Sequence, residues 1–219
     1  IVHLMTGVAW GNYQDYFGGK FDGREHWAEV QTRRNGSRMP HGRSTEVFYN
    51  VPTPAYTEYM KTVVRRAIDT GVRAIHLEEP EYWVAAGYSD AIKEAWRREY
   101  GEPWQPPHSS VEARYRSGRL KRKLYTDCLT VLFKDAEAYA AEQGRSIRCY
   151  VPTHSLINYA QWRIVSPEGN LMHLDEADGY IAQIWTGTAR TPNLYGGRLR
   201  ERTFETAFLE YGQMVNMGR

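Results

Sequence analysis

The sequence predicts an α/β fold, namely a partial (β/α)8 TIM barrel with about four parallel strands and flanking helices. The chain has 219 residues, of which 42% are hydrophobic, and this is enough to bury one large core. Short apolar runs alternate with longer segments of helical periodicity, which is typical of a parallel sheet with right-handed crossovers. An open doubly wound α/β sheet is the alternative, although no strand leads into the Gly-x-Gly-x-x-Gly helix start of its nucleotide-binding versions.

The individual elements follow from periodicity and from residues typical of helix ends. We expect strands over 1–9, 72–77, 147–151 and 179–185, and helices over 54–71, 89–100, 109–143, 167–176 and 204–215. Ser109 precedes Glu112 by three residues, a capping-box pattern that predicts the start of the longest helix, and Gly118 is a point where this helix can break. The stretch from 10 to 54 is irregular and rich in aromatic residues, so we expect a loop that covers a site. Its two histidines, His26 and His41, lack metal-ligand spacing and are expected to be solvated.

Composition excludes several classes of partner. Basic and acidic residues number 28 and 26, for a net charge of +2, so the sequence predicts neither nucleic-acid binding nor attachment to an anionic membrane. An apolar run of about 18 residues, the length of a membrane span, does not occur. Cys128 and Cys149 are interpreted as buried thiols. The basic run 114–123 is expected to be a solvated helix face, with phosphate binding as the alternative.

The chain is interpreted as a fragment. It begins inside a strand-like run without an initiator Met and ends just after a helical pattern. We therefore expect 1–219 to be a single domain, the central part of a larger barrel, with the remainder of that barrel as its partner. The cellular compartment cannot be judged from such a fragment.

The segment Ile75–Trp83 carries the strongest chemical signal in the chain. A short apolar strand ends there, and Glu78, Glu79 and Glu81 follow at once, with Tyr82 beside them. Crowded carboxylates at the end of a buried strand repel one another and lose solvation, which raises carboxyl pKa values. A raised pKa is what a general acid near neutral pH requires. We expect Glu79 to be the proton donor, with Glu78 beside it in the catalytic centre.

The ends of the other strands supply a candidate sugar site. In a parallel sheet the carboxyl ends of the strands converge on one edge, where α/β folds place their sites. Amides and acids hydrogen-bond hydroxyl groups, and aromatic rings stack on sugar faces. No cofactor and no metal is expected. The candidate substrate-binding residues are Trp10, Asn12, Glu81, Tyr82, Trp83, His154, Asn158, Gln183 and Trp185.

Leu77-Glu78-Glu79-Pro80 resembles the Asn-Glu-Pro signature after the fourth strand of retaining (β/α)8 glycoside hydrolases, the superfamily of many β-galactosidases and cellulases. The resemblance implies cleavage of glycosidic bonds in oligo- or polysaccharides, with Glu79 as general acid/base. Trp185 resembles the aromatic residues that floor the sugar subsite in that family. Glu78 stands where the family has Asn, which in those enzymes contacts the sugar 2-hydroxyl. The family's nucleophile follows the seventh strand and would lie beyond Arg219, so the fragment alone is expected to be inactive.

Two alternatives remain open at this point. One is a metal-dependent hydrolase that uses His76, Glu78 and His154, although the sequence has no His-Glu-x-x-His pattern. The other is a non-catalytic carbohydrate-binding barrel.

Overall fold

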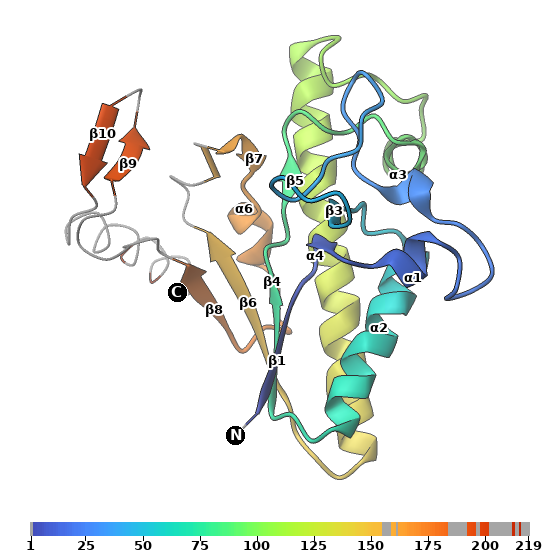
Figure 1. Ribbon diagram of the computed structural model, residues 1–219, viewed down its shortest axis with the longest axis vertical. Coiled ribbons are helices and arrows are strands. Elements are labelled where there is room, and N and C mark those ends of the chain that lie inside the picture. Colours follow the sequence, from blue (N-terminus) through green and yellow to red (C-terminus); the bar gives the residue numbers. More distant parts are fainter. Residues whose placement is uncertain are drawn as a thin grey trace.

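The computed structural model describes residues 2–154, 159–160, 162–183, 192–195 and 198–201, together with positions 212 and 215. Its centre is a four-stranded parallel sheet with the order β1-β4-β6-β8 (Figure 1). The strands are β1 (His3–Gly7), β4 (Ala74–Glu78), β6 (Arg148–His154) and β8 (Gly179–Gln183). The expected mixed α/β fold with a parallel sheet and flanking helices is therefore confirmed.

Helices α2 (Pro54–Asp69) and α4 (Val111–Glu142) pack against each other on one face of the sheet (Figure 1). Thr53 caps α2, because its hydroxyl accepts the Tyr56 N–H and Pro54 occupies the first helical position. Ser110 caps α4 by accepting the Ala113 N–H. The remaining helices are α1 (Gln14–Phe17), the 3-10 helix η1 (Trp27–Glu29), α3 (Asp90–Tyr100) and α6 (Glu168–Leu171).

Three expectations about these elements were wrong in detail. Ser109 does not cap α4, because its hydroxyl donates to the Pro106 carbonyl instead. Gly118 does not break α4, which runs unbroken for 32 residues. The expected helix at 167–176 is shorter, with only Glu168–Leu171 helical. The expected helix at 204–215 lies almost wholly outside the described residues.

The two faces of the sheet differ in how they are covered. Ile75 and Leu77 point towards the helices and are fully buried, and Ile75 is in register with the buried Cys149 of β6. On the opposite face Met5 is 58% exposed and Ile181 is 39% exposed. The helices thus bury one face, and the other face of the described sheet remains open.

Three two-stranded ribbons surround the sheet. β2 (Trp10–Gly11) pairs with β3 (Phe48–Tyr49) and closes the long loop after β1 back onto the sheet end. β5 (Tyr82–Trp83) pairs with β7 (Ile164–Val165), and β9 (Pro192–Tyr195) pairs with β10 (Arg198–Glu201). None of the described helices is long and apolar enough to cross a membrane.

Strand β6 is longer than expected. It continues through Pro152 to His154, and these last residues pair with β8 in register, with His154 opposite Gln183. His154 is therefore the final residue of a strand and not part of the loop that follows it. The sheet therefore fixes the backbone position of His154.

Candidate functional site

Side chains from the ends of three neighbouring strands meet at the carboxyl edge of the sheet. Trp10 follows β1, Glu79 follows β4 and His154 ends β6. The Trp10 indole Nε1 donates to Glu79 Oε2 at 2.6 Å, and His154 Nε2 lies 2.9 Å from Glu79 Oε1. Glu79 is only 7% exposed. A buried carboxylate is thus held between an indole and an imidazole that are far from it in sequence.

The backbone of Glu79 is in the left-handed region, with φ of 56°. This conformation is uncommon for a residue other than glycine and costs free energy. It is stabilised here because the Glu79 N–H donates to the Pro152 carbonyl of β6 at 2.9 Å, and the Glu81 N–H donates to the Glu79 carbonyl at 2.7 Å. The chain therefore leaves the strand alternation at Glu79. Strained backbone that neighbouring elements fix in this way clusters at functional sites.

Glu81 belongs to the same cluster as Glu79 and His154. It is 1% exposed, and its Oε1 lies 3.3 Å from His154 Nε2 without a hydrogen-bond partner of its own among the described residues. Burial, together with the charges of Glu79 and Glu78, raises the pKa of Glu81 well above its usual value. Glu81 is buried in this structure, and its expected role as a contact residue stays a prediction.

The three carboxyl groups have pKa values shifted in different directions. Burial and the charge of Glu79 raise the pKa of Glu78, which is half-buried at the strand end. Burial also acts to raise the pKa of Glu79, but the hydrogen bonds from His154 and Trp10 outweigh it, so this pKa is lowered. The expectation that Glu79 has the raised pKa of a proton donor was therefore wrong, and the raised values belong to its two neighbours.

Aromatic rings surround the charged cluster. Trp10 stacks on His41 with ring centroids 4.0 Å apart, and Trp162 lies edge-on to His154 at 4.7 Å. The backbone N–H of His154 donates to the Tyr159 hydroxyl at 3.1 Å. His41 was expected to be solvated, yet it is half-buried against the indole. Its backbone N–H donates to the Val47 carbonyl at 2.9 Å, and the preceding Pro40 forms a bridge with Phe48 of β3. His41, Tyr159 and Trp162 were not among the expected site residues, because only the aromatic content of their loops indicated a role.

The other expected contact residues fall into four groups. Tyr82 is 1% exposed and packs in the core, and its expected contact with a substrate stays a prediction. Asn12 is exposed and donates to Glu46, without a described hydrogen bond to the carboxylate cluster. Trp83 lines the neighbouring cavity, and the Gln183 backbone pairs with His154 at the site edge. Asn158 and Trp185 lie outside the described residues.

The metal site expected as an alternative does not form. His76 lies inside β4, where its Nε2 is 3.1 Å from His3 Nδ1, and not at the strand end with Glu78 and His154. A different set of donors is close enough to hold a metal ion. One donor atom from each of Glu79, Glu81 and His154 lies within 4.8 Å of the others.

Comparison with known proteins gives little further guidance. No family model matches the sequence, and no curated protein is significantly similar to it. Among solved structures, the chain is similar to the glycoside hydrolase domain of PelA from Pseudomonas aeruginosa, with 10% sequence identity and a TM-score of 0.45. That similarity covers 97% of this chain and 61% of the other, so the chain spans less than two thirds of its length. At this level the likeness supports no assignment, and the function is inferred from the geometry of the site.

Proposed function

We propose that the chain is the central part of a glycoside hydrolase-like catalytic domain that cleaves glycosidic bonds in an oligo- or polysaccharide by carboxylate general acid/base catalysis. One observation carries this proposal. Glu79 is held as a buried carboxylate by Trp10 and His154 at the carboxyl edge of a parallel sheet, and the half-buried Glu78 lies next to it in sequence with its pKa shifted in the opposite direction.

Opposite pKa shifts on neighbouring carboxyl groups support a division of roles into an acid and a base. Glu78, with the raised pKa, would donate its proton to the glycosidic oxygen as the bond to the sugar carbon breaks. Glu79 stays ionised, so it would stabilise the positive charge that develops on the sugar ring and take the proton of the attacking water. Glu79 then releases the proton it took from water to the solvent, and Glu78 regains a proton from the solvent. The sequence resemblance implies that Glu79 donates the proton, whereas in this proposal Glu78 donates it and Glu79 acts as the base.

The open face of the sheet supports the proposal that the chain is part of a larger barrel. β1 and β8 are the two edges of the described sheet, and exposed edges are a liability for a protein that stands alone. Further parallel strands would pair with these edges and cover Met5 and Ile181. A partial (β/α)8 barrel completed in this way would enclose the open face and keep the Glu79 cluster at its rim.

The test compares Glu78→Gln and Glu79→Gln in a protein that contains the complete domain. Loss of the proton donor should lower hydrolysis of unactivated saccharides by about a hundredfold or more, and should affect aryl glycosides with good leaving groups much less. Loss of the Glu79 carboxylate should lower hydrolysis of both substrate types. Glu58→Gln, on the exposed surface of α2, is the matched control. Activity of both variants equal to that of the wild type would remove these residues from the mechanism.

A second candidate is a metal-dependent hydrolase. It is favoured by the three donors of Glu79, Glu81 and His154, and by the Glu81 Oε1 that lacks a hydrogen bond among the described residues. Two carboxylates and one imidazole suit a divalent cation such as Zn²⁺ or Mn²⁺. Metal analysis of the purified protein distinguishes the candidates. A stoichiometric metal that is lost in Glu81→Gln would support the metal-dependent reaction over the carboxylate pair.

A further inference from the structure

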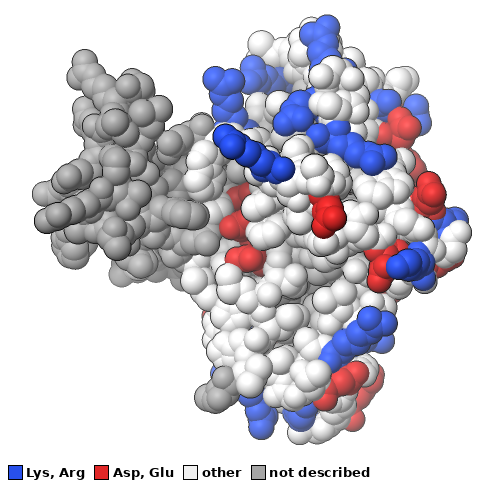
Figure 2. All heavy atoms as spheres, viewed as in Figure 1, with Lys and Arg blue, Asp and Glu red and all other residues white. Residues whose placement is uncertain are grey.

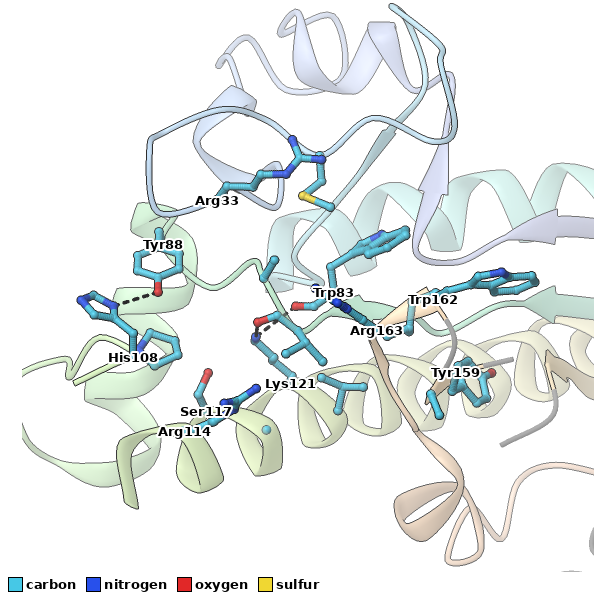
Figure 3. A pocket seen from close by; sticks show the side chains of 18 residues that line it. Arg33, Trp83, Tyr88, His108, Arg114, Ser117, Lys121, Tyr159, Trp162 and Arg163 are labelled. Atoms are coloured by element: carbon cyan, nitrogen blue, oxygen red, sulfur yellow. Dashed lines mark hydrogen bonds between the residues drawn. The ribbon is translucent and has the colours of Figure 1, made fainter. Parts of the chain in front are cut away.

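A cavity of about 830 Å³ lies beside the Glu79 cluster. Five stretches of the chain line it: 33–39 in the long loop after β2, 83–88, 107–108 before α4, 114–121 in α4, and 159–165. Figure 3 shows their labelled side chains around the cavity. Trp162 lines the cavity and also contacts the His154 ring edge-on, so one indole separates the cavity from the carboxylates. A ligand that reached the Glu79 cluster from this side would pass over Trp162.

All charged side chains among the described residues that line the cavity are basic. They are Arg33, Arg114, Lys121 and Arg163, and no Asp or Glu is among them. The chain as a whole is nearly neutral, with 28 basic and 26 acidic residues, so this segregation does not follow from composition. Figure 2 shows basic side chains gathered over the upper part of the face in view, around the end of the molecule where α4 begins. A cavity of one sign concentrates ligands of the opposite charge.

Two of these cations are available to a ligand. Arg114 and Arg163 are exposed, and within the described part of the chain neither guanidinium forms an ion pair with an acidic side chain. Arg33 differs, because it donates to Ser37 Oγ and to the Arg38 carbonyl of its own loop. Arg163 also has a left-handed backbone, with φ of 59°, and its carbonyl accepts the Val84 N–H at 2.9 Å. The ribbon thereby fixes the backbone position from which this guanidinium extends.

Lys121 lines the cavity and supports one of its walls. It is 2% exposed, and its Nζ donates to the carbonyls of Trp83, Val84 and Ala86. These contacts hold the wall 83–86 in place and occupy the Lys121 Nζ, so Lys121 does not itself contact a ligand. The basic run that contains Arg114 and Lys121 was expected to be a solvated face, but these two side chains line the cavity.

The rest of the lining suits a sugar. Trp83, Tyr88 and Trp162 present ring surface, and the Tyr88 hydroxyl contacts His108 Nδ1 at 3.0 Å. Aromatic faces stack on pyranose rings, while the planar guanidinium of arginine binds a carboxylate through two parallel hydrogen bonds. Rings and guanidinium groups together match a ligand that has both a sugar ring and a carboxylate.

We propose that this cavity is a subsite for an acidic saccharide, in which the carboxylates of uronic acid units bind Arg114 and Arg163 and a sugar ring packs on Trp162. The inference rests on the proposed function and names the substrate class of that site. The saccharide would extend from the cavity over Trp162, so that the bond to be cleaved lies at Glu78 and Glu79.

Calorimetry with tetramers of galacturonate and of mannuronate tests the proposal, with the methyl esters of the same tetramers as neutral controls. At least one acid tetramer should bind at least ten times more tightly than its ester. Arg114→Gln and Arg163→Gln should each weaken its binding about tenfold, as expected when one charge-assisted hydrogen bond is lost. Arg97→Gln, on the exposed surface of α3 and outside the cavity, should bind like the wild type.

Three results would overturn the proposal: equal binding of acid and ester forms for both sugars, unchanged binding in both cavity variants, or inorganic polyphosphate that binds as tightly as the best acid tetramer. The last would identify a general anion site. Binding of the acid tetramers to Glu78→Gln is measured as well, because this variant lacks the proposed proton donor and keeps the cavity. The measurement therefore tests the subsite separately from catalysis. Acid tetramers that bind without being cleaved by the complete domain would contradict catalysis alone, whereas cleavage of neutral saccharides without acid preference would contradict the subsite alone.

Discussion

The acidic cluster and the basic cavity lie on the two sides of Trp162 and are built in opposite ways. The cluster is buried, and its residues stand at strand ends or directly after them: His154 is 4% exposed and Glu79 7%. The cavity takes its cations from loops, a ribbon and a helix surface, and Arg114 and Arg163 are exposed. Rigid elements hold groups that need accurate geometry, and surface segments supply selectivity. Changes in the two regions should therefore differ in kind: those in the cluster alter stability and chemistry, and those in the cavity alter binding.

The largest effect on stability is expected from His154→Phe. Removal of the imidazole leaves Glu79 without its 2.9 Å partner in a buried site, and breaking such a pair costs about 3 kcal/mol. The pKa of Glu79 is lowered in the folded state, so this contribution is present above the usual pKa of 4.5 and is lost as the pH falls below it.

Urea unfolding at pH 7 and pH 3 measures this difference. His154→Phe should be less stable than the wild type at pH 7, and the gap should narrow at pH 3. The exposed His173→Phe should stay within about 0.5 kcal/mol of the wild type at both values. A gap of the same size at both pH values would mean that His154 acts by packing alone and not by its 2.9 Å contact with the Glu79 carboxylate.

A smaller effect on stability is expected from Lys121, a residue that lines the cavity. Burial and the charge of Arg114 lower the pKa of Lys121 from 10.5 to about 7. Between these values the unfolded chain binds a proton that the folded chain does not, so this residue makes the free energy of unfolding increase as the pH rises from about 7 towards 10.5.

Lys121→Met should remove that part of the pH dependence, which thermal unfolding at a series of pH values can follow. Lys134→Met changes a lysine that is 65% exposed and should leave the dependence intact. If both variants and the wild type show the same slope above pH 7, Lys121 is not a buried titrating group.

Local sequence patterns predicted the elements well but the site only in part. The alternation of apolar runs predicted the four parallel strands. Thr53 caps the start of α2 and Gly101 caps the end of α3, and both lie directly outside the helices expected from periodicity. Pairing with β8 extended β6 through Pro152, and no local pattern in 147–151 signals a partner that lies 29 residues along the chain. The sequence placed His154 just after a strand, and its place as the final residue of β6 depends on this pairing with β8.

The electrostatics of the site depended even more on distant contacts. A crowded acidic segment correctly indicated raised carboxyl pKa values, as Glu78 and Glu81 have them. The lowered pKa of Glu79 comes from His154 and Trp10, which lie 75 and 69 residues away in sequence and meet it only in the folded chain. The basic cavity was missed for the same reason, since its cations come from separate segments.

The central claim is the division of roles between Glu78 and Glu79, and their titration tests it most directly. Carboxyl chemical shifts of ¹³C-labelled glutamate, assigned with Glu78→Gln and Glu79→Gln, report the two pKa values separately. We expect the value for Glu78 to lie above the usual 4.5 and the value for Glu79 to lie below it. The reverse order, with Glu79 protonated while Glu78 is ionised, would contradict the proposed mechanism.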